Sequence, residues 1–380
     1  MATSAIGPGF LTQTAVFTQD LLTSFGFVIL VSVLIDIGAQ LNIWRIITMS
    51  ESRAQVLGEK LFPGLGMLLA ALIVFGGLIF NTGNIGGTGL GLQILTGMDT
   101  KTCAVISCLL ALVIFWLKDA GHLIDLTTRV LGLIMIGLTV YVAFVSHPPL
   151  GEALYRTVWP ERIDELKIVT LVGGTVGGYI SFAGAHRLLD AGIKGRGQLA
   201  QVNRSAVSGI LITSVMRFIL FLAALGVVWQ GIQLDPANPP ASVFAHAAGQ
   251  AGYYFFGVVL WCAAITSVIG ASYTSVSFLK TFHPFIERKE KYFITGFIMI
   301  SCLVFLVAGR PVRLLIFAGA ANGMILPLAL AIILIIALRK PLLKDYRHPV
   351  VLQVLGWLIV AVMGYMGYVS IAESIRQLLQ

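Results

Sequence analysis

The chain has 380 residues, of which 57% are hydrophobic and only 11% charged, and its mean hydropathy is +0.92. Soluble domains carry about 25% charged residues, so this composition excludes a soluble protein and indicates an integral membrane protein. The apolar runs are too long for barrel strands and predict membrane-spanning helices. The net charge of +8 is then expected in cytoplasmic loops and does not indicate a nucleic-acid-binding surface.

Windows of about 20 apolar residues predict the transmembrane helices. Eleven spans result, at residues 4–23, 25–44, 61–82, 102–117, 123–146, 168–190, 206–229, 252–279, 293–309, 313–338 and 350–371. The polar stretch 147–167 is predicted to be a loop outside the cytoplasm. It separates two sets of five spans, residues 1–146 and 168–338, and the eleventh span with the C-terminus follows at 339–380.

The basic residues of the loops orient these spans. With the N-terminus in the cytoplasm, sixteen of the 25 Lys and Arg residues fall in inside loops and seven in outside loops, while Arg129 and Arg217 fall within spans. Basic residues accumulate in the cytoplasmic loops of membrane proteins. We therefore predict a multi-pass protein of the bacterial cytoplasmic (inner) membrane, with its N-terminus in the cytoplasm and its C-terminus outside.

Two spans carry the signs of an interrupted helix. Residues 173–190 contain five glycines before they end in His186, Arg187 and Asp190, and residues 7–20 combine Gly7-Pro8-Gly9 with polar side chains. Glycine costs a helix interior about 1 kcal/mol relative to alanine, so this density predicts close helix packing, a break, or both. Interrupted spans at the start of two five-span halves are typical of the leucine-transporter-type inverted repeat (5+5). The predicted fold is therefore all-α and integral to the membrane, with the first and sixth helices broken.

Several collinear stretches resemble the natural resistance-associated macrophage protein (NRAMP) family of divalent-metal transporters. They are Gly7-Pro8-Gly9-Phe10-Leu11 in the first span, Gln40 with Trp44-Arg45 in the second, residues 89–97 in the third, Ala185-His186 in the sixth and residues 326–329 in the tenth. The resemblance covers most of the chain and implies a transporter with the same inverted repeat.

The resemblance also implies where a metal site would lie. In the family, an Asp-Pro-Gly-Asn motif lies at the break of the first span, and the sixth span adds an alanine carbonyl and a methionine two residues before a histidine. Counting along the matched stretches places the motif at Thr18, Gln19, Asp20 and Leu21, the alanine and methionine at Ser181 and Gly184, the acidic pair of the third span at Asn81 and Asn84, and a glutamine of the tenth span at Gly319.

These replacements remove the ligands that a divalent cation needs. Near the bilayer midplane such an ion must exchange its water for charged or strongly polar ligands, and a threonine hydroxyl or a glycine does not provide them. Two asparagines cannot relay protons as carboxylates do. Glycines at 184 and 319 also leave room for a larger solute. Either the site is a wholly altered metal site or the substrate has changed, and we favour a changed substrate.

The unwound middles of the two broken spans are expected at residues 14–19 and 181–186, where the backbone would supply most polar contacts to the solute. The candidate residues follow from these positions. For substrate binding they are Thr14, Thr18, Gln19, Ser181, Gly184, His186, Gly319 and Asn322, and for a polar or coupling path they are Asp20, Asp36, Asn81 and Asn84. No metal-binding residues and no cofactor are predicted.

Each of these candidates has a structural alternative. His186 and Arg187 could bind a substrate carboxylate at a half-helix start or serve as a gate and a cytoplasmic anchor. Asp20 could be a cation ligand or a helix cap. Asp36 could pair with Arg217 or Arg129 or carry a coupling proton. The asparagines could line a path or hold helices together.

The chain lacks a Walker loop, a nucleophile elbow and an HExxH motif, so no enzyme is predicted. The function predicted is secondary active transport of a small organic acid or amino-acid-like solute by alternating access. Family relatives without the metal motif are associated with 5-oxoproline breakdown, which makes pyroglutamate the specific candidate. The alternatives are a Mg²⁺ or Mn²⁺ transporter with an altered site and a membrane sensor without transport. The partners expected are the solute or ion and the lipid bilayer, with no nucleic acid and the oligomeric state left open.

Overall fold

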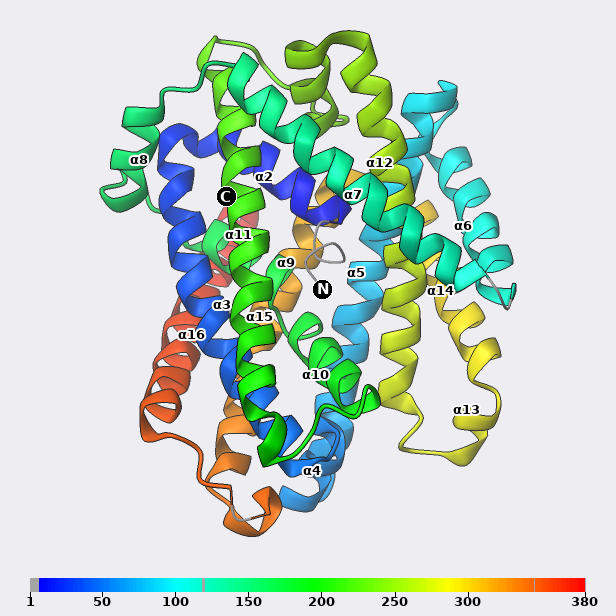
Figure 1. Ribbon diagram of the computed structural model, residues 1–380, viewed down its shortest axis with the longest axis vertical. Coiled ribbons are helices and arrows are strands. Elements are labelled where there is room, and N and C mark those ends of the chain that lie inside the picture. Colours follow the sequence, from blue (N-terminus) through cyan, green and yellow to red (C-terminus); the bar gives the residue numbers. More distant parts are fainter. Residues whose placement is uncertain (1–6, 118–119, 345, 380) are drawn as a thin grey trace.

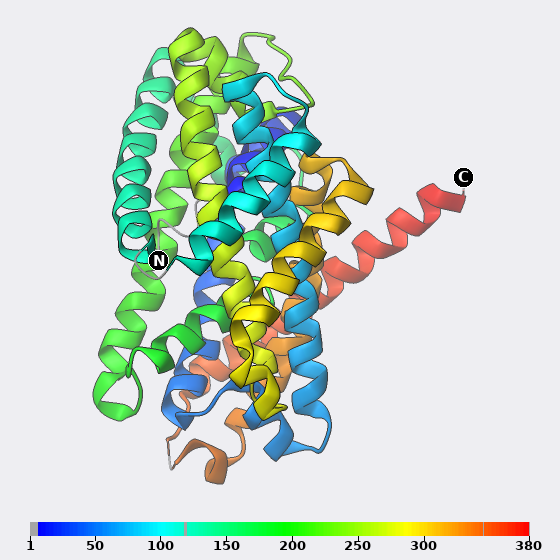
Figure 2. The same cartoon turned by 90° about the vertical axis from the view of Figure 1, so that its right-hand side faces the viewer.

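The computed structural model describes residues 7–117, 120–344 and 346–379, and all regular elements in these ranges are helices. Figure 1 shows an elongated bundle in which most helices follow the long axis, and Figure 2 shows that α16 leaves the bundle toward its C-terminal end. In chain order the elements are α2 (Pro8–Leu21), η1 (Leu22–Ser24), α3 (Phe25–Ser50), α4 (Ala54–Leu61), α5 (Leu65–Thr96), α6 (Thr100–Trp116), α7 (Ala120–Val145), α8 (Leu150–Val158), α9 (Glu165–Thr175), α10 (Ile180–Asp190), η2 (Arg196–Gln198), α11 (Leu199–Trp229), α12 (Pro239–Leu279), α13 (Pro284–Arg288), α14 (Glu290–Ala308), α15 (Pro311–Ala337), η3 (Lys340–Leu343) and α16 (Val350–Leu379).

The structure bears out a multi-pass helical membrane protein. Within the described residues, eight helical stretches are long and apolar enough to cross a membrane, or nine if α7 and α8, which are bent by 108°, count as one span. Each of the eleven predicted segments overlaps one or more helices of the described residues. The structural count of nine is lower than eleven for two reasons. Helices α2 and α3 are counted as one stretch, Pro8–Ser50, and α6 is not counted because it has only 17 residues.

The sixth predicted span is broken, as expected, but at a different place. Helix α9 ends at Thr175 and α10 begins at Ile180, so the interruption covers residues 176–179. The stretch 181–186, which we expected to be unwound, is helical. The prediction of the position was wrong because it followed His186, whereas the adjacent glycines at 177 and 178 interrupt the helix.

The first span differs from the prediction in the same way. Residues 14–19 were expected to be unwound, yet α2 runs without interruption from Pro8 to Leu21. The hydroxyl of Thr14 donates to the Phe10 carbonyl at 2.7 Å, and that of Thr18 donates to the Thr14 carbonyl at 2.6 Å. Fourteen residues span about 21 Å, less than the roughly 30 Å of a bilayer core. Helix α2 therefore begins inside the bundle, between its two ends (Figure 1).

The sequence of α2 explains why it starts there. Pro8 occupies the first helical turn, where its fixed φ suits a helix and its missing N–H is not needed. Residues 1–6, which belong to the predicted first span, lie outside the described residues.

Glycine allows the helices around the break to approach at backbone distance. A Cβ atom on Gly173 of α9 would lie 1.8 Å from the carbonyl oxygen of Gly319 and 2.3 Å from the backbone nitrogen of Gly323, both on α15. Small residues at such contacts are typical of helix packing in membranes, where van der Waals contact replaces hydrophobic attraction between helices. The glycine density of this span therefore serves both close packing and the break.

We expect Gly173→Ala to be strongly destabilising, because the added methyl group meets backbone atoms that cannot rotate away. Overpacking of a core costs about 1–3 kcal/mol or more. Gly209→Ala on α11 is the matched control, since nothing lies within 4 Å of its added Cβ. Thermal unfolding of both variants in detergent measures the difference, and equal melting temperatures would contradict the packing described here.

The loop before α16 is fastened to α3 by a half-buried histidine. His348 Nε2 lies 2.7 Å from Asn42 Oδ1. Burial lowers the pKa of His348 to about 4, and the charge of Arg45 adds to this effect. In an unfolded chain the pKa is about 6.5. Because the folded value is the lower one, the unfolded state binds more protons between these values, and stability falls as the pH drops from about 6.5 toward 4.

The corresponding prediction concerns how the melting temperature depends on pH below 6.5. Between pH 6.5 and 4.5 the melting temperature of His348→Gln should fall less steeply than that of the wild type, because no proton uptake accompanies its unfolding at this position. His246→Gln, at an exposed histidine, should keep the wild-type slope. Parallel profiles for all three proteins would show that His348 is not the group responsible.

Candidate substrate site at the helix break

The break between α9 and α10 is held by one residue of α15. Gly178 donates its backbone N–H to the Asn322 carbonyl at 2.9 Å, and Tyr179 donates its backbone N–H to Asn322 Oδ1 at 3.1 Å. Asn322 Nδ2 in turn donates to the carbonyls of Gly76 at 3.1 Å and Ala318 at 2.9 Å. Asn322, a predicted substrate residue, lies at the break, and its carboxamide already holds the interrupted backbone.

Helix α2 begins next to the end of α9. Gln13 Nε2 donates to the Leu315 carbonyl at 3.1 Å. Gln13 Oε1 has no hydrogen-bond partner among the described residues and lies 2.5 Å from where a Cβ of Gly174 would be. A Cβ on Gly319 would lie 2.4 Å from Gln13 Nε2. The room that a glycine at 319 was expected to leave is therefore filled by the Gln13 side chain.

A buried arginine joins the two helix ends. Arg217 of α11 is only 3% exposed, and its Nη1 donates to the Thr175 hydroxyl at 2.8 Å. Its guanidinium carbon lies 4.3 Å from the centre of the Phe10 ring. Asp36 of α3, 1% exposed, lies within the electrostatic reach of Arg217 and beside Thr175. A charged pair thus flanks the place where α2 begins and α9 ends.

Three predicted residues lie at the other end of α2. Thr18 is buried and bonded within its own helix. Gln19 Oε1 accepts from the Leu234 backbone N–H at 2.8 Å, and the Asp20 carboxylate is 3.3 Å from Lys167 Nζ. The structure therefore does not bring Thr18, Gln19 and Asp20 to the break. The role of Thr14, buried between the two ends of α2, stays a prediction.

The predicted residues of the sixth span divide between the two ends of α10. Ser181, at its start, donates its hydroxyl to the Val176 carbonyl at 2.6 Å. Gly184 is buried one turn further on. His186 accepts from the Ala54 backbone N–H at 3.3 Å through Nε2 and stacks on Phe278, with ring centres 4.2 Å apart. The contacts of His186 therefore connect α10 to α4 and α12.

The ion pair beside His186 lies on the same side of the bundle. Arg53 donates to Asp190 at 2.8 Å and to the Ser277 carbonyl at 3.1 Å. These contacts fasten the loop before α4 to α10 and α12, a position suited to a gate.

The two asparagines of α5 are separate from this site. Asn81 Nδ2 donates to the hydroxyls of Ser272 at 3.0 Å and Ser301 at 3.1 Å, which links α5 to α12 and α14. Asn84 is buried. Asn81 therefore holds helices together, and a role for either residue in a polar path stays a prediction.

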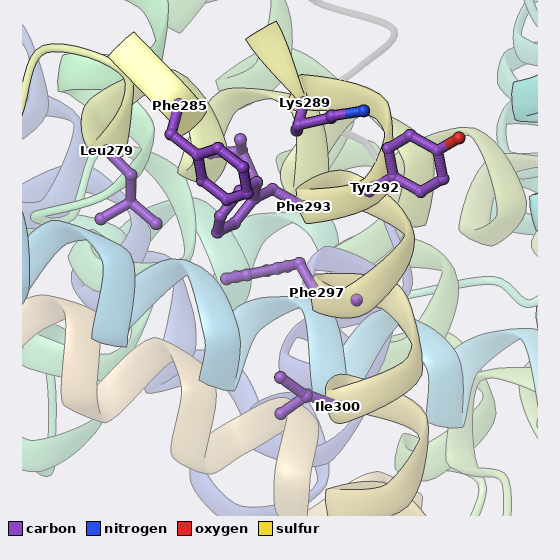
Figure 3. Close-up of a pocket in the computed structure, with 9 residues that line it drawn as sticks. Leu279, Phe285, Lys289, Tyr292, Phe293, Phe297 and Ile300 are labelled. Atoms are coloured by element: carbon purple, nitrogen blue, oxygen red, sulfur yellow. The ribbon is translucent and has the colours of Figure 1, made fainter. Parts of the chain in front are cut away.

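The described part of the chain offers no metal cluster, since no group of three or more His, Cys, Asp or Glu side chains could hold an ion there. A separate pocket of about 520 Å³ lies between the end of α12, α13 and α14 (Figure 3). Phe285, Phe293 and Phe297 line it, with Lys289 and Tyr292 at one side. Its apolar wall suits hydrocarbon and not a small polar solute, so we do not assign it to the substrate.

Several side chains at the break were not among the predicted substrate residues. Gln13, Thr175 and Tyr179 were not singled out, and Arg217 was noted only as a possible partner of Asp36. Of the two partners considered for Asp36, Arg217 lies close enough to act on it electrostatically, whereas the side chain of Arg129 lies outside the described residues. The signal that could have found Arg217 was its position, because an arginine within a membrane span is a functional candidate by default.

The start of the short helix α2 and the end of the short helix α9 meet inside a membrane bundle. This arrangement is typical of transporters of the leucine-transporter fold, and structural comparison supports this class. A variant of the Eremococcus coleocola manganese transporter aligns with a TM-score of 0.73 at 13% identity over 100% of this chain and 86% of that one. MhsT in complex with L-phenylalanine aligns with a TM-score of 0.60 at 16% identity over 96% of both chains.

Sequence comparison then gives the family. The model of the natural resistance-associated macrophage protein-like (Nramp) family matches residues 1–373. The uncharacterized membrane protein YcsG of Bacillus subtilis is 56% identical over 378 residues, covering 100% of this chain and 94% of that protein. An uncharacterized membrane protein of Haemophilus influenzae is 56% identical over 375 residues, covering 99% and 94%. The chain belongs to the Nramp family of transporters, which confirms the resemblance found in the sequence.

Asn322→Leu should be destabilising by about 1–3 kcal/mol, because it leaves the buried backbone N–H of Tyr179 without its acceptor, Asn322 Oδ1. Asn84→Leu is the matched control, since the Nδ2 atom that it removes has no partner in the described structure and its loss should cost less. Thermal unfolding in detergent ranks the two variants. A smaller loss for Asn322→Leu than for Asn84→Leu would contradict the role of Asn322.

Proposed function

We propose that the chain is a secondary active transporter of a small organic carboxylate, with pyroglutamate as the specific candidate, in the bacterial cytoplasmic membrane. The observation that carries this proposal is the chemistry at the helix break. Gly174, Gly177 and Gly178 line the break itself, and the charged pair beside it includes a buried arginine, Arg217. A transition metal is usually held by several His, Cys, Asp or Glu side chains, and no group of three or more of these gathers there among the described residues.

The position of α2 suggests a better alignment with the family motif. The motif Asp-Pro-Gly-Asn belongs to the break of the first span, and the helix start that faces the α9 break is Gly7-Pro8-Gly9-Phe10. The two sequences share Pro-Gly, whereas residues 18–21 lie at the far end of α2. We infer that Gly7 and Phe10 replace the metal-binding aspartate and asparagine, and neither side chain offers an oxygen.

The same argument applies to the sixth span. The family pattern has a methionine two residues before a histidine and an alanine three residues before the methionine. Placed on the observed break, this spacing gives Gly174, Gly177 and Tyr179. The thioether is absent in this alignment too, so both alignments lead to the same conclusion about metal ligands.

The alternative of a Mg²⁺ or Mn²⁺ transporter needs a carboxylate that is free to bind the ion. Asp20 lies 3.3 Å from Lys167 Nζ, and Asp36 lies beside Arg217. Each carboxylate thus has a cation as its neighbour, which weakens its attraction for a second cation. The fold itself does not require a metal substrate, since MhsT, which shares it, is known in complex with L-phenylalanine.

The proposed transport cycle follows from the inverted repeat. Residues 1–146 and 168–338 would form the two repeats, and rocking of one bundle against the other would expose the break to each side in turn. The basic loops favour a cytoplasmic N-terminus and an outside C-terminus. The contacts of Arg53 with Asp190 and Ser277 would then lie at the cytoplasmic end and close that side.

Transport by the purified full chain in proteoliposomes tests the proposal. We expect saturable uptake of labelled pyroglutamate, reduced by excess unlabelled small carboxylates, and no uptake of Mn²⁺ or Mg²⁺ above that of protein-free liposomes. Saturable Mn²⁺ or Mg²⁺ uptake without uptake of any carboxylate would overturn the proposal in favour of a metal carrier. Binding of a carboxylate without flux would instead indicate a sensor.

A further inference from the structure

Arg217 has hydrogen-bonding capacity that the protein does not use. Nη1 is bonded to Thr175, but neither Nε nor Nη2 has a hydrogen-bond partner within the described residues. The side chain is 3% exposed, so water does not satisfy these donors at the surface. A buried charged group with unmade hydrogen bonds is costly, and inside a membrane span it points to a functional role.

The two free nitrogens form one edge of the guanidinium group. Nε–H and one Nη2–H point in parallel, which is the fork that a carboxylate accepts with both oxygens. The plane of the group is fixed at two points, because Thr175 holds Nη1 at 2.8 Å and the Phe10 ring lies against its face at 4.3 Å. The free edge is thus a preorganised carboxylate binder, anchored at the end of α9 and the start of α2.

Asp36 does not accept a hydrogen bond from the free Nε and Nη2 atoms of Arg217. Its Oδ1 atom also lacks a hydrogen-bond partner in the described part of the chain, although Asp36 lies within the field of Arg217 and beside Thr175. Arg217 is the one charged group that acts on Asp36 among the described residues. The pair therefore balances charge without a direct contact, and each partner keeps an unsatisfied polar atom.

We propose that the Nε/Nη2 edge of Arg217 binds the carboxylate of the transported solute, and that Asp36 takes up one proton when the carboxylate arrives. This inference rests on the function proposed above and identifies its binding residue and coupling ion. The bound carboxylate would leave one excess negative charge beside Arg217 and Asp36 in a medium where isolated charge is very costly. A proton on an Asp36 oxygen removes that excess, so each carboxylate crosses the membrane with one proton. Opening of the bundle during alternating access gives the solute its route to the buried edge.

Arg217→Lys tests the binding edge, because it keeps the charge but loses the two parallel donors. We expect pyroglutamate affinity, measured by calorimetry on purified protein, to fall by about tenfold or more. Arg204→Lys, at an exposed position of the same helix α11, should stay within about twofold of the wild type. Unchanged affinity in Arg217→Lys would overturn the proposal.

Thr175 provides a test that does not alter the arginine. Thr175→Val removes the acceptor for Nη1 and leaves the guanidinium less well oriented, whereas Thr175→Ser keeps the hydroxyl. We expect weaker pyroglutamate binding in Thr175→Val and nearly normal binding in Thr175→Ser. Equal affinities in the two variants would show that the orientation of Arg217 does not matter for binding.

Proton uptake on binding tests Asp36. In weakly buffered solution with a pH-indicator dye, the wild type should take up about one proton for each pyroglutamate bound, and Asp36→Asn should bind with no uptake. Uptake that persists in Asp36→Asn would exclude Asp36 as the acceptor. A wild type that binds Mn²⁺ and no carboxylate would refute the proposed function itself, whereas carboxylate binding that ignores Arg217 would refute only the inference.

Discussion

Asn322 satisfies the constraint on which the rest of the site depends. A chain inside a bilayer must pair its own backbone polar groups, because lipid offers no acceptors. The break at residues 176–179 releases N–H groups, and Asn322 accepts those of Gly178 and Tyr179 through its carbonyl and its side chain. Without this second helix the interruption would be too costly, and α9 would continue into α10 as an ordinary span.

Asn322 can reach the break only because α15 lies against α9 at backbone distance. Gly173 and Gly319 make that approach possible, since a Cβ on either would overlap backbone atoms of the other helix. Close packing also leaves little space at the end of α9, so most polar groups beside Thr175 come from side chains that enter from other helices. Gln13 enters from α2 and Arg217 from α11. The glycines therefore decide which residues can form the site as well as how the helices pack.

Composition and hydropathy predicted the fold class, and the glycine density predicted the break in the sixth span. Both signals are local along the chain, so they can be read from the sequence without knowing which helices are in contact. The position of the break was wrong because it was counted from His186, a residue whose contacts with Ala54 and Phe278 place it at the other end of α10. The proximity of Phe10, Thr175 and Arg217 could not be predicted from such local signals. These residues are far apart in sequence, and only the packing of α2, α9 and α11 brings them together.

The electrostatic field at the break supports the proposed change of substrate by an argument that does not depend on any alignment. Helix α2 begins there, and the start of a helix carries roughly half a positive charge. Arg217 adds a full positive charge against the Phe10 ring of the same turn, and Asp36 is its acidic neighbour. A divalent cation would bring two more positive charges to a place that already has an excess. A carboxylate instead lowers that excess, so the field favours an anionic group independently of which side chains coordinate it. Restoring the family's aspartate at Gly7 alone would therefore not create a metal site, because Arg217 would pair with the new carboxylate or repel the ion.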